Sequence, residues 1–163
     1  MFHSFLPLVP LTVAGAVLFK KKNWALLVPV ILILLKVAST SFYPSYLFTF
    51  LGLIAGVLVI RSIRERKGSS LLAVAGYAFI AVTLYELVSS MGLWILGGCT
   101  AEEGRLYAFT LSGLTEVFRS SFPYMMSHFL RDLPLSVIVV KSLEWILRLQ
   151  PIKALQPSFA QGK

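Results

Sequence analysis

The chain has 163 residues, of which 57% are hydrophobic and only 13% are charged, and its mean hydropathy is +0.81. Soluble domains carry roughly one quarter charged residues, so this composition excludes an ordinary soluble domain and indicates a membrane protein. The net charge of +8 would suit nucleic acid, but most of the Lys and Arg residues stand at the ends of apolar runs, where basic residues set membrane orientation. We therefore expect a lipid bilayer and no nucleic-acid partner.

Five apolar runs of a length near the ~20 residues that cross ~30 Å of hydrocarbon account for most of the chain. They cover residues 4–19, 24–39, 45–60, 70–96 and 132–149. We expect one all-α transmembrane helical bundle over residues 1–150. Residues 151–163 contain two prolines and few apolar side chains, which predicts a flexible cytoplasmic tail.

Basic and non-basic loops alternate along the chain, in the order "KKKN", "STSFYPS", "RSIRERKGS" and "GGCTAEEGR". Cytoplasmic loops are enriched in Lys and Arg, so the alternation predicts a multi-pass membrane protein with its N-terminus outside and its C-terminus inside. The bacterial cytoplasmic (inner) membrane is what the family resemblance described below implies. The first apolar run precedes its basic cluster. That order predicts a retained helix rather than a cleaved signal peptide.

The stretch "RLYAFTLSGLTEVFRSSFPYMMSHFL", residues 105–130, has a weaker apolar pattern. Leu111, Leu114 and Val117 recur with helical spacing, while charged residues lie between them. We expect an amphipathic helix at the outer interface. The alternative is a sixth transmembrane helix, which would place the basic C-terminal tail outside, against the pattern of the other loops.

Polar residues form a stripe in the fourth apolar run. Thr83, Glu86, Ser90 and Trp94 follow one another at spacings of three and four, which places them on one helix face. Measured from the same membrane side, Lys36 rises about 18 Å and Glu86 about 24 Å, so the two can pair. One interpretation is a small-molecule site floored by Glu86 and Lys36; the other is a buried ion pair that fixes helix register.

Two other patterns concern helix ends and helix packing. Asp132 opens the last apolar run, and a carboxylate at a helix N-terminus is stabilised by the unpaired amides there. Gly52 and Gly56 form a GxxxG pattern, which lets another helix approach closely. This glycine pattern fits either packing inside the bundle or a surface for a partner subunit.

Nothing in the sequence predicts catalysis or a cofactor. Cys99 is the single cysteine, and the only histidines, His3 and His128, are expected near the outer interface. There is no HExxH motif, no Cys and His pair and no phosphate-binding glycine loop. We expect neither an enzyme nor a bound metal, haem or other cofactor.

Three short segments follow one another along the second half of the chain: "SSMGLW" (89–94), "YAFTLSGL" (107–114) and "FPYMMSHFLRDL" (122–133). They resemble the signatures of an uncharacterised bacterial membrane family related to the S components, the substrate-binding subunits of energy-coupling-factor (ECF) vitamin transporters. The matching positions are Gly92, Trp94, Tyr107, Thr110, Gly113, Leu114, Pro123, Asp132 and Leu133. The chain departs from that pattern at Lys36, Ser90 and Arg131. We also expect the helix that usually precedes "SFLP" in the family to be missing.

The resemblance implies an S-component-like subunit that takes up a vitamin-sized small molecule and is energised by a separate transmembrane coupling subunit and ATPases. It also implies an outer gate, with Trp94, Tyr107 and Thr110 near the mouth of a cavity. Together with the polar stripe, the expected substrate-binding set is Lys36, Thr83, Glu86, Ser90, Trp94, Tyr107, Thr110 and Asp132. The alternative, favoured by the missing helix, is a non-catalytic accessory or structural subunit of a larger membrane protein complex.

Overall fold

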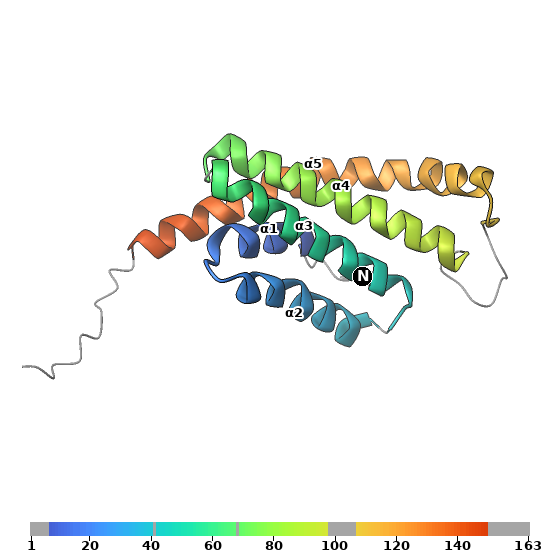
Figure 1. The fold of residues 1–163 in the computed structure, drawn as a ribbon, viewed down its shortest axis with the longest axis horizontal. Coiled ribbons are helices and arrows are strands. Elements are labelled where there is room, and N and C mark those ends of the chain that lie inside the picture. The colour runs from blue at the N-terminus through green and yellow to red at the C-terminus, as the bar shows by residue number, and fades with distance from the viewer. Residues whose placement is uncertain (1–6, 41, 68, 98–106, 150–163) are drawn as a thin grey trace, which may run out of the picture.

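The computed structural model describes residues 7–40, 42–67, 69–97 and 107–149, and these residues form five helices. They are α1 (Leu8–Leu18), α2 (Lys22–Thr40), α3 (Ser45–Lys67), α4 (Leu71–Leu96) and α5 (Leu111–Leu149), as Figure 1 shows. The predicted all-α class is confirmed. Three of the helices, α2, α3 and α4, are long and apolar enough to cross a membrane. The predicted tail, 151–163, lies outside the described residues.

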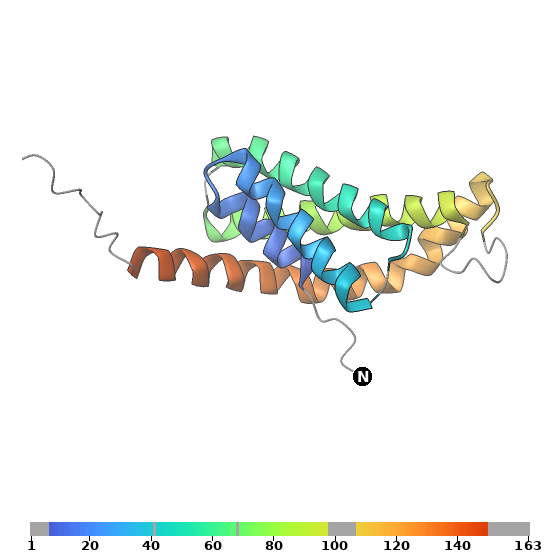
Figure 2. The ribbon, with the colours of Figure 1, turned by 90° about the horizontal axis from the view of Figure 1, so that it is seen from below.

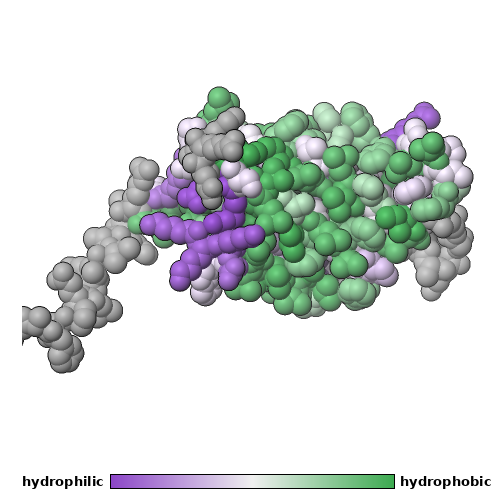
Figure 3. Space-filling view, in the orientation of Figure 1, coloured by the Kyte–Doolittle hydropathy of each residue, from purple (hydrophilic) through white to green (hydrophobic). Residues whose placement is uncertain are grey.

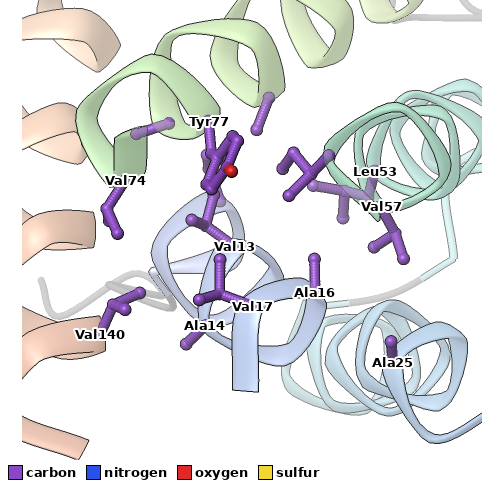
Figure 4. Close-up of a cluster of buried hydrophobic side chains, with 14 of the residues drawn as sticks. Val13, Ala14, Ala16, Val17, Ala25, Leu53, Val57, Val74, Tyr77 and Val140 are labelled. Atoms are coloured by element: carbon purple, nitrogen blue, oxygen red, sulfur yellow. The ribbon is translucent and has the colours of Figure 1, made fainter. Parts of the chain in front are cut away.

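The short helix α1 lies at the centre of the bundle. Its 11 residues span about 16 Å, and nine of them are buried. Within the described chain, α1 contacts each of the other four helices. Figure 4 shows Val13 and Val17 of α1 among apolar side chains from the surrounding helices, including Tyr77, Leu53 and Val140. The first predicted span is therefore the core of the bundle, with its residues 4–6 outside the described ranges.

Helices α3 and α4 pack against each other through the GxxxG pattern. A Cβ atom at Gly52 would lie 2.9 Å from the Cα atom of Tyr85, so only glycine allows this approach. A Cβ atom at Gly56 would lie 3.5 Å from the Cα atom of Ala81, an ordinary contact. The glycine face is thus packed inside the bundle, against α4.

The ends of α4 carry recognisable capping residues. The Ser70 hydroxyl accepts a hydrogen bond from the backbone N–H of Ala73 (3.2 Å), which caps the N-terminus. Gly97 has a φ angle of 79°, in the left-handed region, and its N–H bonds the Leu93 and Trp94 carbonyls. These caps define a 26-residue helix close to the predicted run of residues 70–96.

Basic residues gather at the end of the bundle where α1 meets α2. Figure 3 shows hydrophilic side chains concentrated at this end, with a hydrophobic surface over the body of the molecule. Arg61 of α3 donates hydrogen bonds to the carbonyl oxygens of Phe19 (2.7 Å) and Lys20 (2.8 Å). Because carbonyls at a helix C-terminus lack partners within the helix, Arg61 stabilises the end of α1.

Helix α5 corrects the sequence prediction for the C-terminal third. The expected division into an interfacial helix over 105–130 and a separate span over 132–149 is wrong, because one 39-residue helix runs from Leu111 to Leu149. Its length is about 58 Å. Pro123 and Pro134 lie inside it without ending it. Figures 1 and 2 show that the C-terminal part of α5 extends beyond the other helices.

Asp132 was expected to cap the last span, and this prediction was also wrong. The residue lies in the middle of α5 and is only 2% exposed. Its carboxylate accepts hydrogen bonds from Arg131 Nε (2.6 Å) and Nη2 (3.1 Å). Since this neighbour neutralises the buried charge, the helix continues through the "RD" pair rather than starting there.

A buried polar cavity as the candidate functional site

A polar cavity of about 120 Å³, partly open to the surface, lies where four helices converge. Its walls come from α1, α2, α4 and α5. The lining residues are Leu8, Val9, Lys36, Tyr85, His128, Arg131 and Asp132. Two of the sequence-predicted site residues, Lys36 and Asp132, therefore line one cavity although 96 positions separate them in the chain.

Glu86 borders this cavity through His128. The carboxylate of Glu86, on α4, is hydrogen-bonded to Nδ1 of His128, on α5, and the Glu86 side chain is only 9% exposed. The ring of Tyr85 lies beside the imidazole, with centroids 5.8 Å apart. A carboxylate taken out of water requires a compensating partner, and His128 is that partner here.

The expected pairing of Glu86 with Lys36 is therefore corrected, because the structure gives each of them a different neighbour. The Lys36 ammonium lies 4.9 Å from the centroid of the Tyr46 ring on α3, a cation–π geometry. Among the described residues, Lys36 forms no ion pair with a carboxylate. Asp132, the carboxylate in the cavity wall, is bonded to Arg131 instead.

The rest of the predicted polar stripe points to other places. Thr83 donates its hydroxyl hydrogen to the Phe79 carbonyl (2.8 Å) and lines an apolar groove of about 670 Å³ between α4 and α5. Ser90 is buried one turn beyond Glu86, outside the cavity lining. Helical spacing correctly placed these residues near one another, but they do not share one pocket.

Trp94 belongs to the corner that joins α4 to α5. Its indole N–H donates to the Ala108 carbonyl (3.1 Å), and its ring stacks on Phe109 with centroids 4.4 Å apart. Trp94 comes eight residues after Glu86, or about 12 Å further along α4, so it does not line the cavity. Its contacts hold the chain segment that leads into α5.

Tyr107 and Thr110 belong to the same corner. The Tyr107 hydroxyl is hydrogen-bonded to the Ser120 hydroxyl (3.1 Å). Thr110 precedes α5, and its hydroxyl oxygen accepts from the backbone N–H of Gly113 (3.2 Å), the geometry of a helix N-cap. These contacts organise the α4–α5 connection. Residues 98–106, between these two helices, lie outside the described residues.

His128 and Tyr85 were not in the predicted binding set, yet both line the cavity. A signal for His128 was present, since it stands three and four residues before Arg131 and Asp132 and so shares their helix face. It was missed because residues 105–130 were assigned to the membrane interface. Among the described residues, no group of three or more His, Cys, Asp or Glu side chains is arranged to hold a metal ion.

The fold and the cavity together define a class: an all-helical bundle with helices long and apolar enough to cross a membrane and with a small, partly open cavity lined by charged side chains. In a comparison with known protein families, one family model matches residues 1–155, which include all five helices. The chain belongs to that family, a family of unknown function (DUF6580). No curated protein and no solved structure matches the chain.

Proposed function

We propose that the protein is a membrane-embedded, non-catalytic binding subunit that captures a small molecule in the polar cavity. In this proposal it acts like an S component, and a separate transmembrane coupling subunit with ATPases energises uptake. The observation that carries the proposal is the convergence of Lys36, His128 and Asp132 on one cavity inside an apolar bundle. Ionisable groups at membrane depth are costly and generally mark ligand or ion sites.

The volume of the cavity limits the size of the ligand that fits in this conformation. Its volume of about 120 Å³ is smaller than the ~300–1,000 Å³ of typical ligand pockets. Only one polar end of a vitamin-sized molecule therefore fits in the cavity. A helix has to move outward to make room for the remainder of the molecule. Helix α2 is the best candidate, because its buried residues are only Ala25, Pro29 and Leu32, so displacing it exposes little core.

The proposed orientation in a bacterial inner membrane has the basic end inside. Glu86 comes 15 residues after Leu71, the first residue of α4, which is about 22 Å from that end. For hydrocarbon of ~30 Å, this depth lies beyond the midplane and toward the outer side. A ligand arriving from outside would thus have the shorter path to the cavity.

A second candidate function is an accessory subunit of a larger membrane complex. The observation in its favour is a stripe of exposed apolar side chains on α2 at alternating spacings of three and four residues. The stripe consists of Trp24, Leu27, Ile31 and Leu34. This spacing is that of a helix packing seam, so the stripe suits a partner helix as well as lipid.

Native mass spectrometry after gentle detergent extraction tests the proposal. A small molecule that co-purifies with the chain supports the binding subunit, whereas stoichiometric large subunits without a small molecule support the accessory role. Glu86→Ala should lower the occupancy of the small molecule, because His128 then loses the carboxylate that holds it. Glu116→Ala, which changes an exposed acid of α5, is the matched control. Equal occupancy in both variants contradicts the cavity as the site.

A further inference from the structure

We infer that the chemical group recognised by the cavity is a carboxylate, held by Lys36, and that its binding brings one proton to His128. This inference rests on the proposed function and names the ligand class of the same cavity. It follows from three features of the cavity, namely a lysine that forms no ion pair within the described residues, a small volume, and a charge balance that a bound anion disturbs.

Within the described residues, Lys36 forms no ion pair with a carboxylate. The two carboxylates near the cavity have other neighbours, since Asp132 is paired with Arg131 and Glu86 is hydrogen-bonded to His128. The ammonium of Lys36 lies in the cavity wall with the Tyr46 ring at 4.9 Å. A ring face stabilises an ammonium but supplies no negative charge, so an anion in the cavity is favoured.

The volume of the cavity restricts the size of the anion. About 120 Å³ equals the share of roughly four water molecules in the liquid, which is the scale of a carboxylate with a short alkyl group. The wall is mainly polar, and Leu8 and Val9 of α1 supply its small apolar part.

A bound carboxylate changes the charge of the site. With a neutral His128, two cations (Lys36 and Arg131) balance two carboxylates (Glu86 and Asp132), and the sum is zero. An added anion leaves one uncompensated negative charge in an interior of low dielectric constant, which is costly. Protonation of His128 restores the balance.

The hydrogen bond to Glu86 defines where this proton goes. An ionised carboxylate only accepts, so Nδ1 of His128 carries the hydrogen of that bond and Nε2 is the nitrogen that takes the new proton from water. The titratable and charged groups that surround His128 and the cavity come from α2 (Lys36), α3 (Tyr46, beside Lys36), α4 (Tyr85 and Glu86) and α5 (Arg131 and Asp132). Helix α1 contributes only Leu8 and Val9 to the lining.

Calorimetric titration of the full chain in detergent micelles with acetate, and with acetamide as the uncharged analogue of similar size, tests the carboxylate. Acetate is expected to bind at least tenfold more tightly than acetamide. Lys36→Met, which keeps the length of the side chain and removes its charge, should weaken acetate binding at least tenfold. Lys20→Met, which removes an exposed lysine outside the cavity, should leave it unchanged.

The proton is measured by repeating the acetate titration in two buffers of different ionisation enthalpy. An observed binding enthalpy that changes with the buffer, corresponding to one proton taken up per acetate, is the expected result. His128→Asn, which retains a donor for Glu86 but cannot gain the proton, should bind acetate with a buffer-independent enthalpy. A buffer-independent enthalpy in the unmodified protein would overturn the proton step.

The failures of the two proposals are distinguishable. Equal affinities for acetate and acetamide, or undiminished acetate binding by Lys36→Met, overturn the carboxylate inference and leave the binding subunit standing. If the protein co-purifies with another small molecule but does not bind acetate, the carboxylate inference is again overturned and the binding subunit still stands. No acetate binding together with no co-purifying molecule overturns the inference and the proposed function.

Discussion

One hydrogen bond between side chains, from Nδ1 of His128 to the carboxylate of Glu86, joins α5 to α4 across 42 positions of sequence. Breaking it from either side leaves a buried polar group unpaired. We therefore expect Glu86→Ala and His128→Ala each to lower the free energy of unfolding, and the double variant to lose less than the sum. The expected coupling is about 0.5–2 kcal/mol, from a double-mutant cycle followed by denaturation in mixed micelles. A cycle of Glu86 with the exposed Ser127 should give no coupling.

The two glycines of the GxxxG pattern should respond differently to alanine. Gly52→Ala places a Cβ atom 2.9 Å from the Tyr85 backbone, which has to shift, so a loss of about 1–3 kcal/mol in unfolding free energy is expected. Gly56→Ala meets Ala81 at an ordinary 3.5 Å, and the higher helix propensity of alanine makes it neutral or stabilising by up to about 1 kcal/mol. Equal effects of the two substitutions would show that the close α3–α4 approach is not the reason for Gly52.

Thr12 carries a hydroxyl that is fully buried in α1 and has no hydrogen-bond partner in the described part of the chain. Thr12→Val keeps the shape and removes the unpaired hydroxyl, so we expect the unfolding free energy to rise by about 1 kcal/mol. The control is Thr49→Val, because the Thr49 hydroxyl bonds the Ser45 carbonyl (3.4 Å) and the Ser89 hydroxyl (3.5 Å). The unfolding free energy of Thr49→Val should fall by about 1 kcal/mol. A fall in the unfolding free energy of Thr12→Val would contradict the expectation for Thr12.

Thr110 should behave as a helix cap and not as a ligand-binding residue. Thr110→Ala removes the acceptor for the Gly113 N–H and should cost about 1 kcal/mol of stability, with acetate affinity unchanged. Thr115→Ala in the same helix removes only an exposed hydroxyl bonded to the Leu111 carbonyl, and its effect should stay within about 0.5 kcal/mol. A drop in acetate affinity for Thr110→Ala alone would return this residue to the binding site.

The apolar runs predicted the first four helices, because a long apolar run bounded by charged or turn residues has few alternatives to a helix. The predicted end of the third was wrong, since α3 continues from residue 60 through charged residues to Lys67. For α5 the same reasoning failed. The charged pair Arg131 and Asp132 resembles a helix start, and only the bidentate bond between the two side chains shows why the helix continues. Pair geometry of this kind cannot be read from sequence spacing alone.

The candidate site was predictable in part. Lys36, Glu86 and Asp132 were chosen because buried charge is costly, and the structure brings all three to one cavity or its border. Their partners were not predictable, because pairing depends on how α2, α4 and α5 rotate against one another. Trp94, Tyr107 and Thr110 entered the predicted set through family resemblance, and their contacts lie in the α4–α5 corner.

The unbroken course of α5 has a mechanical consequence. His128 and Asp132 stand between Pro123 and Pro134, the two positions where the helix lacks a backbone N–H donor. From Asp132 the helix continues 17 residues to Leu149, about 26 Å. With no loop to absorb a movement, a change in tilt of about 10° at the cavity displaces Leu149 by about 4 Å. A movement of α5 at the cavity is thereby transmitted to a helix end that projects beyond the bundle.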